Sequence, residues 1–326
     1  MYTVLPYNAT TDEAYAVLVD IHNAAWPDEL GTVASWRFHD NSWPQEKLRQ
    51  RFVVESDGQL VTEGVYMQPF WTNVPGKYVY GYSSLPGYEE RAELHQSIYE
   101  YVLTQLTERQ PTILGTDIRE DHRIRTQWLE SQGFVPKMRF PISELDITAF
   151  DFSRFNGAQE RVAAAGVQIT PLAQVRERDP RWMEKLYAMF WEIEQDIPHI
   201  DPPVKEPFEE YVKGYDNPNF WPEGWFMAID PALDVNGPSG EYVGVSMLAK
   251  NPAMPRRINT WLTGVLRSHR RKGIALAMKL RAIEFAIQQG GTAIRTDNEE
   301  NNPMLGINKA LGFVEIPAEV AFDKEL

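Results

Sequence analysis

The sequence contains no cysteine and no long apolar run. Zero Cys among 326 residues excludes disulfides, thiolate metal sites, iron–sulfur clusters and a cysteine nucleophile. No stretch of about 18 consecutive apolar residues is present, so no membrane span is expected. The first residues, Met1 to Pro6, lack the basic stretch and apolar run of a signal peptide. We therefore expect a cytoplasmic protein.

Several familiar catalytic patterns are also missing. The six histidines show no metal-ligand spacing, so no metal site is expected. A Gly-x-Ser-x-Gly elbow is absent, which leaves a serine hydrolase without support. Neither a Walker loop nor a Gly-x-Gly-x-x-Gly fingerprint occurs, which disfavours NTP hydrolysis and dinucleotide binding.

Positive charge is scarce overall but concentrated in one place. The formal net charge of −14 argues against nucleic acid and anionic membranes as partners. The stretch from Asp201 to Glu241 contains nine acidic residues and only two lysines. The stretch from Tyr242 to Ile283 contains no acidic residue at all. That stretch is rich in arginine and lysine, a pattern typical of a site that holds a small anion.

The length and the order of expected elements predict two copies of one fold. At roughly 100–200 residues per domain, 326 residues indicate two domains. Each half runs through a strand, a helix, three strands, a long helix, a strand, a helix and a last strand. Similar signatures close both halves, with Gly133-Phe134-Val135 in the first and Gly312-Phe313-Val314 in the second. We expect an α/β protein with a mixed α+β sheet flanked by helices in each domain, over residues 1–150 and 163–326.

The segment from Thr263 to Ala275 carries the clearest chemistry. It leaves a β-rich run, turns through basic residues and opens an amphipathic helix. The unpaired N–H groups and the dipole of a helix N-terminus favour an anion. Gly273 and Ala275 allow the backbone to approach a ligand closely. Arg270, Arg271 and Lys272 supply several positive charges, which suits a pyrophosphate better than a single phosphate.

This segment resembles a cofactor loop of a known family. Arg270-x-x-Gly273-x-Ala275 is similar to the Arg/Gln-x-x-Gly-x-Gly/Ala loop of the GCN5-related N-acetyltransferases (GNAT superfamily). The later stretch from Arg295 to Phe313 resembles the second cofactor motif of that family. The likeness covers most of residues 166–326. The whole chain resembles tandem, two-domain members of the superfamily, the layout found in mycothiol synthase.

The resemblance implies transfer of an acetyl group from acetyl-CoA to an amine within a ternary complex. The backbone N–H of Leu266 would polarise the thioester carbonyl as a single oxyanion donor. The residues that the resemblance assigns to the co-substrate are Val265, Leu266, Arg270, Arg271, Lys272, Gly273, Ile274, Ala275 and Asn301.

The sequence departs from the family pattern where acid and base chemistry is needed. Many members have a tyrosine at the position of Asn308, and an amide cannot protonate a thiolate as a phenol does. The strand from Ile258 to Thr263 has no carboxylate. Glu194 and Asp196 are the candidate catalytic bases. A base at His199 or Asp201, or a chain of waters, remains open.

The acceptor side is predicted from charge. Four acids lie between Glu192 and Asp201, which favours a small, cationic amine as the acceptor. Trp191, Trp221, Trp225 and Trp261 are candidates for lining its pocket or for the core. A monomer or a homodimer is expected, and the identity of the amine is left open. An alternative function is a non-catalytic acyl-CoA-binding sensor or interaction protein.

The first half is expected to be a degenerate copy. Its loop carries Glu89, Glu90 and Ala92 where the second half has Arg270, Arg271 and Gly273. Acidic side chains repel a pyrophosphate, so we predict that this half does not bind CoA in the usual way.

Overall fold

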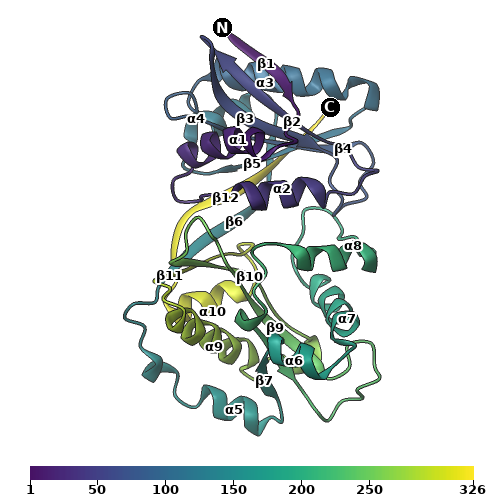
Figure 1. The fold of residues 1–326 in the computed structure, drawn as a ribbon, viewed down its shortest axis with the longest axis vertical. Helices are drawn as coiled ribbons and strands as arrows, with labels where there is room; N and C mark the ends of the chain where they lie inside the picture. The colour runs from purple at the N-terminus through teal and green to yellow at the C-terminus, as the bar shows by residue number, and fades with distance from the viewer. The chain divides into compact units, whose positions relative to one another are not determined.

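The computed structural model describes residues 1–326, which form two compact units (Figure 1). The first unit comprises Met1–Pro141, His199–Val204 and Pro317–Leu326. The second comprises Ile142–Pro198 and Lys205–Ile316. No helix is both long and apolar enough to cross a membrane.

The first unit is a mixed sheet with helices on both faces. Its sheet has the order β1-β2-β3-β4-β5-β12, and only the β4–β5 pair is parallel. The elements are β1 (Tyr2–Tyr7), α1 (Asp12–Ala25), α2 (Val33–Asn41), β2 (Arg49–Ser56), β3 (Gln59–Met67), β4 (Lys77–Ser84), α3 (Ala92–Leu106), β5 (Ile113–Arg119), α4 (Arg123–Ser131) and β12 (Val314–Glu325).

Strand β2 shows how that sheet buries both faces. Phe52 and Val54 join the core under α3, whereas Val53 between them packs with residues of α1 on the opposite face. Successive side chains of a strand point to opposite faces, so a run of buried residues serves two helical layers. Helix α3 packs on one of these faces through fully buried residues spaced four apart, which are Leu94, Ile98, Val102 and Leu106.

The second unit repeats this design. Its sheet order is β6-β11-β10-β9-β8-β7, and only the β10–β11 pair is parallel. The elements are β6 (Val135–Asp146), α5 (Ala158–Ala164), β7 (Gln168–Pro171), α6 (Leu172–Arg178), α7 (Trp182–Glu194), α8 (Phe208–Lys213), β8 (Trp225–Ile229), β9 (Tyr242–Ala249), β10 (Arg257–Val265), α9 (Ile274–Gln288), β11 (Ala293–Asp297) and α10 (Met304–Leu311).

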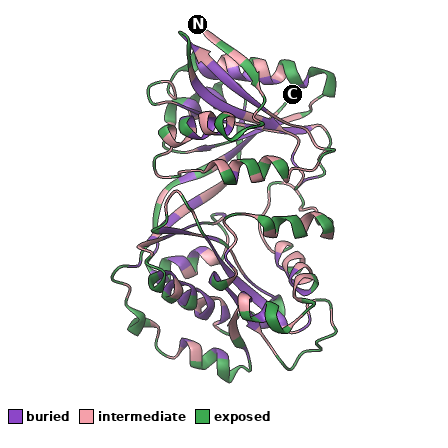
Figure 2. Cartoon of the chain, viewed as in Figure 1, coloured by how far each residue is buried: buried purple, intermediate pink, exposed green.

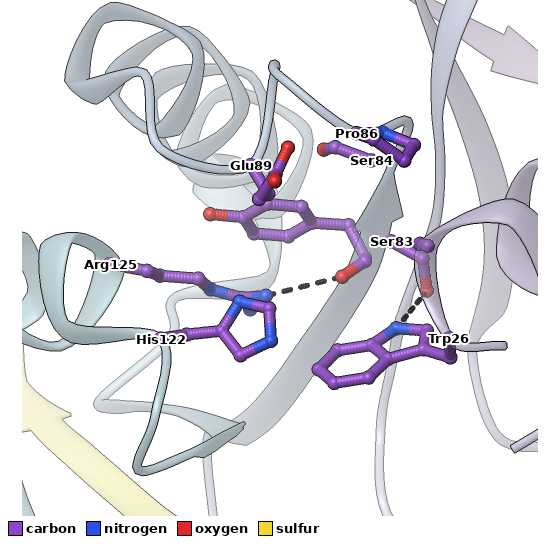
Figure 3. Close-up of a pocket in the computed structure, with 9 residues that line it drawn as sticks. Trp26, Ser83, Ser84, Pro86, Glu89, His122 and Arg125 are labelled. Carbon is purple, nitrogen blue, oxygen red and sulfur yellow. Dashed lines mark hydrogen bonds between the residues drawn. The ribbon is translucent and has the colours of Figure 1, made fainter. Parts of the chain in front are cut away.

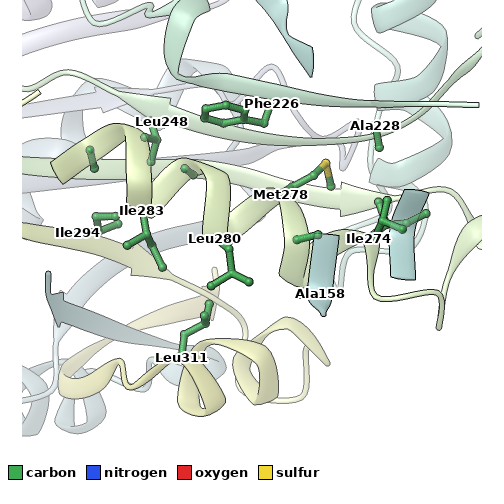
Figure 4. Packing of buried hydrophobic residues seen from close by; sticks show 14 of the residues in the cluster. Ala158, Phe226, Ala228, Leu248, Ile274, Met278, Leu280, Ile283, Ile294 and Leu311 are labelled. Atoms are coloured by element: carbon green, nitrogen blue, oxygen red, sulfur yellow. The ribbon is translucent and has the colours of Figure 1, made fainter. Parts of the chain in front are cut away.

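Two hydrophobic cores lie on the two faces of the second sheet. Along β8, Phe226 and Ala228 pack with residues of α9 (Figure 4), whereas Trp225 and Met227 pack with residues of α6 and α7. Figure 2 shows buried strands and helices whose outer faces are exposed. The mixed α/β class and the helix-flanked mixed sheet expected for each half are confirmed.

The last strand of each half joins the sheet of the other half. Strand β6 pairs with β11, with Ser143 opposite Thr296, and β12 pairs with β5, with Phe322 opposite Thr116. The two units therefore differ from the continuous ranges 1–150 and 163–326, which assumed that each last strand stays in its own half. Hydrophobic periodicity identifies a strand but carries no information about which sheet edge it joins.

Candidate functional site

Strand β10 separates from its parallel neighbour β11 after three residue pairs. The register ends at Asn259 opposite Arg295, although β10 continues to Val265. A bulge places Trp261 and Leu262 opposite a single residue of β9 and bends the strand. One edge of β10 beyond Asn259 therefore has no strand partner. In the first unit, β4 pairs with β3 in unbroken register, so that half lacks the bulge.

The direction of each backbone group along β10 decides which N–H could reach a ligand. Leu266 donates its N–H to the carbonyl oxygen of Val243 at 2.9 Å, on the β9 side. This bond occupies the N–H that the sequence assigned to the oxyanion, so the geometry does not favour Leu266 as that donor. Neighbouring residues of a strand point their N–H groups to opposite sides, so the N–H of Val265 faces the open edge. The Val265 carbonyl accepts from Arg270 Nε at 2.9 Å, away from β9.

The loop after β10 ends at the N-terminus of α9. Gly273 is the N-cap, with φ of +80°, and a Cβ there would meet nothing within 4 Å. No side chain caps α9, and no acid lies in its first turn, so its first N–H groups stay available to an anion. Arg271, with φ of +62°, and Lys272 are exposed beside them. This open, uncapped and basic helix start fits a pyrophosphate.

A buried histidine holds this loop in place. His269 is 6% exposed, and its Nε2 donates to Asp230 Oδ2 at 3.0 Å, while Ser268 Oγ lies 2.9 Å from its Nδ1. A carboxylate accepts only, so the proton on Nε2 follows from this contact. The hydrogen bond from His269 holds the pKa of Asp230 below its ordinary value. The sequence analysis missed this pair, because 39 residues separate its members.

Asp196 does not act as a free base in this structure. Its carboxylate is bound by both Arg267 and Arg270, and its side chain is 12% exposed. The hydrogen bonds from Arg267 and then Arg270 hold the pKa of Asp196 below its ordinary value. A carboxylate made less basic in this way is a poor general base. The geometry therefore favours an electrostatic role for Asp196 at the loop over the catalytic one expected from the sequence.

Glu194 lies at the end of α7, next to β10. Its neighbour Ile193 packs so tightly on Gly264 that a Cβ at Gly264 would lie 2.5 Å from Ile193 Cγ2. Only glycine permits this approach of the α7 end to the strand that carries Val265. Glu194 is half-buried there, and it is the one expected base that this geometry keeps near the strand.

The second expected motif is held by a buried acid. Glu299, 6% exposed, accepts from the backbone N–H of Asn301 at 2.9 Å and from its Nδ2 at 2.8 Å. Asn308 is fully buried and donates Nδ2 to Asn298 Oδ1 at 2.6 Å. A buried amide in this position supplies no acidic proton, as expected from the sequence.

The remaining acceptor-side candidates divide between core and surface. Trp221 and Trp225 belong to the two hydrophobic cores of the second unit, whereas Trp261 is 41% exposed at the β10 bulge. Asp201 is bound to Lys77 Nζ at 2.7 Å within the first unit. No group of three or more His, Asp or Glu side chains is arranged to hold a metal ion.

Comparison with known proteins agrees with this geometry. Residues 183–313, which include the bulged strand, the loop and α9, match the model of the acetyltransferase (GNAT) family. The second half of the chain is a GNAT domain. Members of this family use acyl-CoA as the acyl donor. No curated protein sequence matches the chain.

Solved structures extend the likeness to the whole chain. A tandem GNAT protein from the clavulanic acid biosynthesis pathway superposes with a TM-score of 0.75 at 15% identity, covering 100% of this chain and 98% of that one. A GCN5-related N-acetyltransferase from Sphaerobacter thermophilus has a TM-score of 0.66 at 15% identity, with coverages of 99% and 95%. FemX has a TM-score of 0.52 at 12% identity, with coverages of 99% and 97%. At these identities the likeness establishes the tandem GNAT fold.

Proposed function

We propose that this protein transfers an acetyl group from acetyl-CoA to the amine of a small molecule. The observation that carries the proposal is the bulged strand β10, which separates from β11 and leads through a basic loop into the uncapped N-terminus of α9. Both substrates would bind together, and the amine would attack the thioester directly. The first half lacks this bulge and carries acids in its loop, which supports the proposal that it does not bind CoA in the usual way.

The co-substrate would be held at two places on the second unit. The pyrophosphate would bind to the N–H groups at the start of α9, with Arg271, Lys272 and the charge of Arg270 beside them. Binding of phosphate would compete with Asp196 for Arg270. The pantetheine chain would extend the unpaired edge of β10, where backbone donors and acceptors have no strand partner.

Three groups would carry the chemistry at the thioester. The N–H of Val265 would donate to the carbonyl oxygen, whose negative charge grows as the amine attacks. Glu194 would remove the proton from the attacking nitrogen. The CoA thiolate would leave and take its proton from water, because Asn308 is a buried amide. Asp196 would tune the charge of the loop.

The acceptor side supports an amine of positive charge. Glu192 and Glu194 both lie in the last turn of α7, where their negative charges would attract a cationic amine. Exposed Trp261 lies on the same strand as Val265 and offers an apolar surface for the remainder of the acceptor.

Binding of acetyl-CoA is tested by calorimetry with two matched variants. Gly273 and Gly290 stand at the two ends of α9, with φ of +80° and +79° and open space at both Cβ positions. Gly273→Asp puts a negative charge at the proposed pyrophosphate site, and we expect at least about tenfold weaker binding. Gly290→Asp strains the backbone equally but should leave the affinity unchanged. Equal effects of the two variants would refute the site.

Catalysis is tested separately by thiol release. Mixing the protein with acetyl-CoA and a panel of small amines should release CoA at a rate that depends on the amine. Glu194→Gln should lower kcat by about a hundredfold or more at unchanged affinity for acetyl-CoA. Tight binding without any amine-dependent rate would instead identify an acyl-CoA sensor.

A further inference from the structure

A small cavity in the first unit is lined by two oppositely charged side chains that are not bonded to each other. It has a volume of about 60 Å³ and lies at the end of β4, between the following loop, the end of α1 and the start of α4 (Figure 3). At about 15 Å³ for each water-sized group, this volume holds roughly four such groups.

Arg125 on α4 supplies the positive charge. It is 5% exposed, and its Nη1 and Nη2 donate to the Tyr82 carbonyl at 3.2 Å and to Thr116 Oγ1 at 3.3 Å. Its guanidinium carbon stacks 3.7 Å from the centre of the Tyr82 ring. Its Nε is buried and has no hydrogen-bond partner. Asp117 interacts electrostatically with this charge, but no protein atom accepts a hydrogen bond from Nε, so an anion in the cavity would supply the missing acceptor.

Glu89 supplies the negative charge. It belongs to the loop between β4 and α3, and its Oε2 is buried without a hydrogen-bond partner. It forms no ion pair with Arg125, although both side chains line the cavity. A buried carboxylate oxygen without a donor is costly, and a cationic donor in the cavity would relieve that cost.

The serine and tyrosine hydroxyls around the cavity are already paired, with Tyr82 Oη bonded to His95 Nδ1, whereas the ring of His122 only stacks on Trp26. Ser83 Oγ accepts from Trp26 Nε1 at 3.1 Å and lies 3.2 Å from His22 Nδ1 (Figure 3 draws the first bond). Ser84 Oγ is bonded to Thr62 Oγ1 at 2.8 Å. The polar groups left for a ligand are therefore the Arg125 guanidinium, the Glu89 carboxylate and the His122 ring.

We propose that this cavity binds a small zwitterion, an α-amino acid such as glycine, alanine or serine. Its carboxylate would accept from Arg125 Nε and from one Nη hydrogen not used by Tyr82 or Thr116, in the side-by-side geometry typical of arginine. Its ammonium would donate to Glu89 Oε2. The small cavity volume favours the smallest amino acids, because the carboxylate alone contributes three non-hydrogen atoms. A simple carboxylate would leave Glu89 unpaired, and a simple amine would leave Arg125 unpaired.

The test uses calorimetry on the full-length protein to compare an amino acid with ligands that carry only its carboxylate or only its ammonium group. We expect alanine to bind at least about tenfold more tightly than acetate or ethylamine, because only alanine satisfies both charges. Phenylalanine should bind weakly, since its ring exceeds the cavity. No detectable binding of any small amino acid, or equal binding of acetate and alanine, would overturn the proposal.

Two neighbouring glutamates provide a matched pair of variants. Glu89→Gln should weaken alanine binding by about tenfold and leave acetate binding unchanged or stronger, because it removes only the partner of the ammonium. Glu90→Gln changes the same charge at an exposed position and should leave both affinities unchanged. Arg125→Lys keeps the charge but loses the side-by-side geometry, and it should weaken both ligands. If Arg125→Lys does not fold, the comparison of the two glutamate variants still tests whether Glu89 binds the ammonium group. Equal effects of Glu89→Gln and Glu90→Gln would contradict the site.

Discussion

Arg270, the first residue of the Arg-x-x-Gly-x-Ala loop, is bound to Asp196 beyond the end of α7. The same carboxylate also binds Arg267 at 2.6 Å through Nε. Asp196 thus neutralises two cations of a loop whose proposed task is to attract phosphate. A protein carboxylate and a pyrophosphate would compete for one guanidinium, so we expect Asp196 to weaken co-substrate binding.

Asp196→Asn should therefore improve acetyl-CoA binding. We expect KM for acetyl-CoA to fall about two- to fivefold, the effect typical of one exposed ion pair, with kcat and its pH profile little changed. Initial-rate kinetics at several pH values measure this. Glu184→Gln, an exposed acid in the first turn of α7, is the control for net charge. A loss of kcat by about a hundredfold at constant KM would make Asp196 the base after all.

Local signals in the sequence predicted the repeated fold. They did not predict that the last strand of each half, β6 or β12, pairs with the sheet of the other half. The Gly-Phe signatures predicted the ends of α4 and α10, where Gly133 and Gly312 have φ of +84° and +99°. The short helices α2, α6 and α8 were not predicted, since they have only six to nine residues and weak periodicity. The sheet edge that β6 or β12 joins depends on tertiary packing, which no local pattern encodes.

The candidate site was predicted where its residues are consecutive. The loop enters α9 at Ile274 after Gly273, as the glycine and the apolar stripe indicated. Which N–H along β10 faces the open edge could not be predicted, because a bulge at Trp261 and Leu262 sets the orientation of every following N–H. The pairing of Asp196 with Arg270 joins residues 74 apart, and spacing alone does not reveal it.

Glu63 makes the stability of the protein depend on pH. It is 4% exposed, and burial raises its pKa from 4.5 to about 7 despite nearby Arg51. The folded state keeps the proton at a pH where the unfolded chain has lost it, so stability falls as pH rises from about 4.5 to 7 and then levels off. Glu63→Gln should be more stable than the parent at pH 8, on the order of 2 kcal/mol, and similar at acidic pH.

Urea unfolding at both pH values measures this difference. Glu46→Gln, at an exposed position, should show no such pH dependence. If Glu63→Gln raised the free energy of unfolding equally at acidic and alkaline pH, the raised pKa of Glu63 would be contradicted.

Gly264 should tolerate no side chain while Ile193 is present. A Cβ would lie 2.5 Å from Ile193 Cγ2, so Gly264→Ala should cost about 1–3 kcal/mol and raise KM by displacing the α7 end. Ile193→Ala removes the clashing atoms, and the double variant should lose less stability than the sum of the two single variants. Thermal unfolding of the four proteins measures the coupling. Gly306→Ala, in open space on α10, is the control and should be neutral or stabilise the protein by up to about 1 kcal/mol. Additive losses would show that this contact does not limit residue 264.

Lys77 should be needed by the first unit, because it neutralises two carboxylates at once. It is 5% exposed, and its Nζ lies 2.7 Å from Asp201 and 2.8 Å from Asp323 of β12. Lys77→Met leaves both acids without a cation, and we expect a loss of about 3–5 kcal/mol in the free energy of unfolding. Replacing both acids by asparagine in the Lys77→Met background should restore much of it. Lys137→Met, at an exposed position, is the control, and a loss no larger than that of the control would show that the buried cluster contributes nothing.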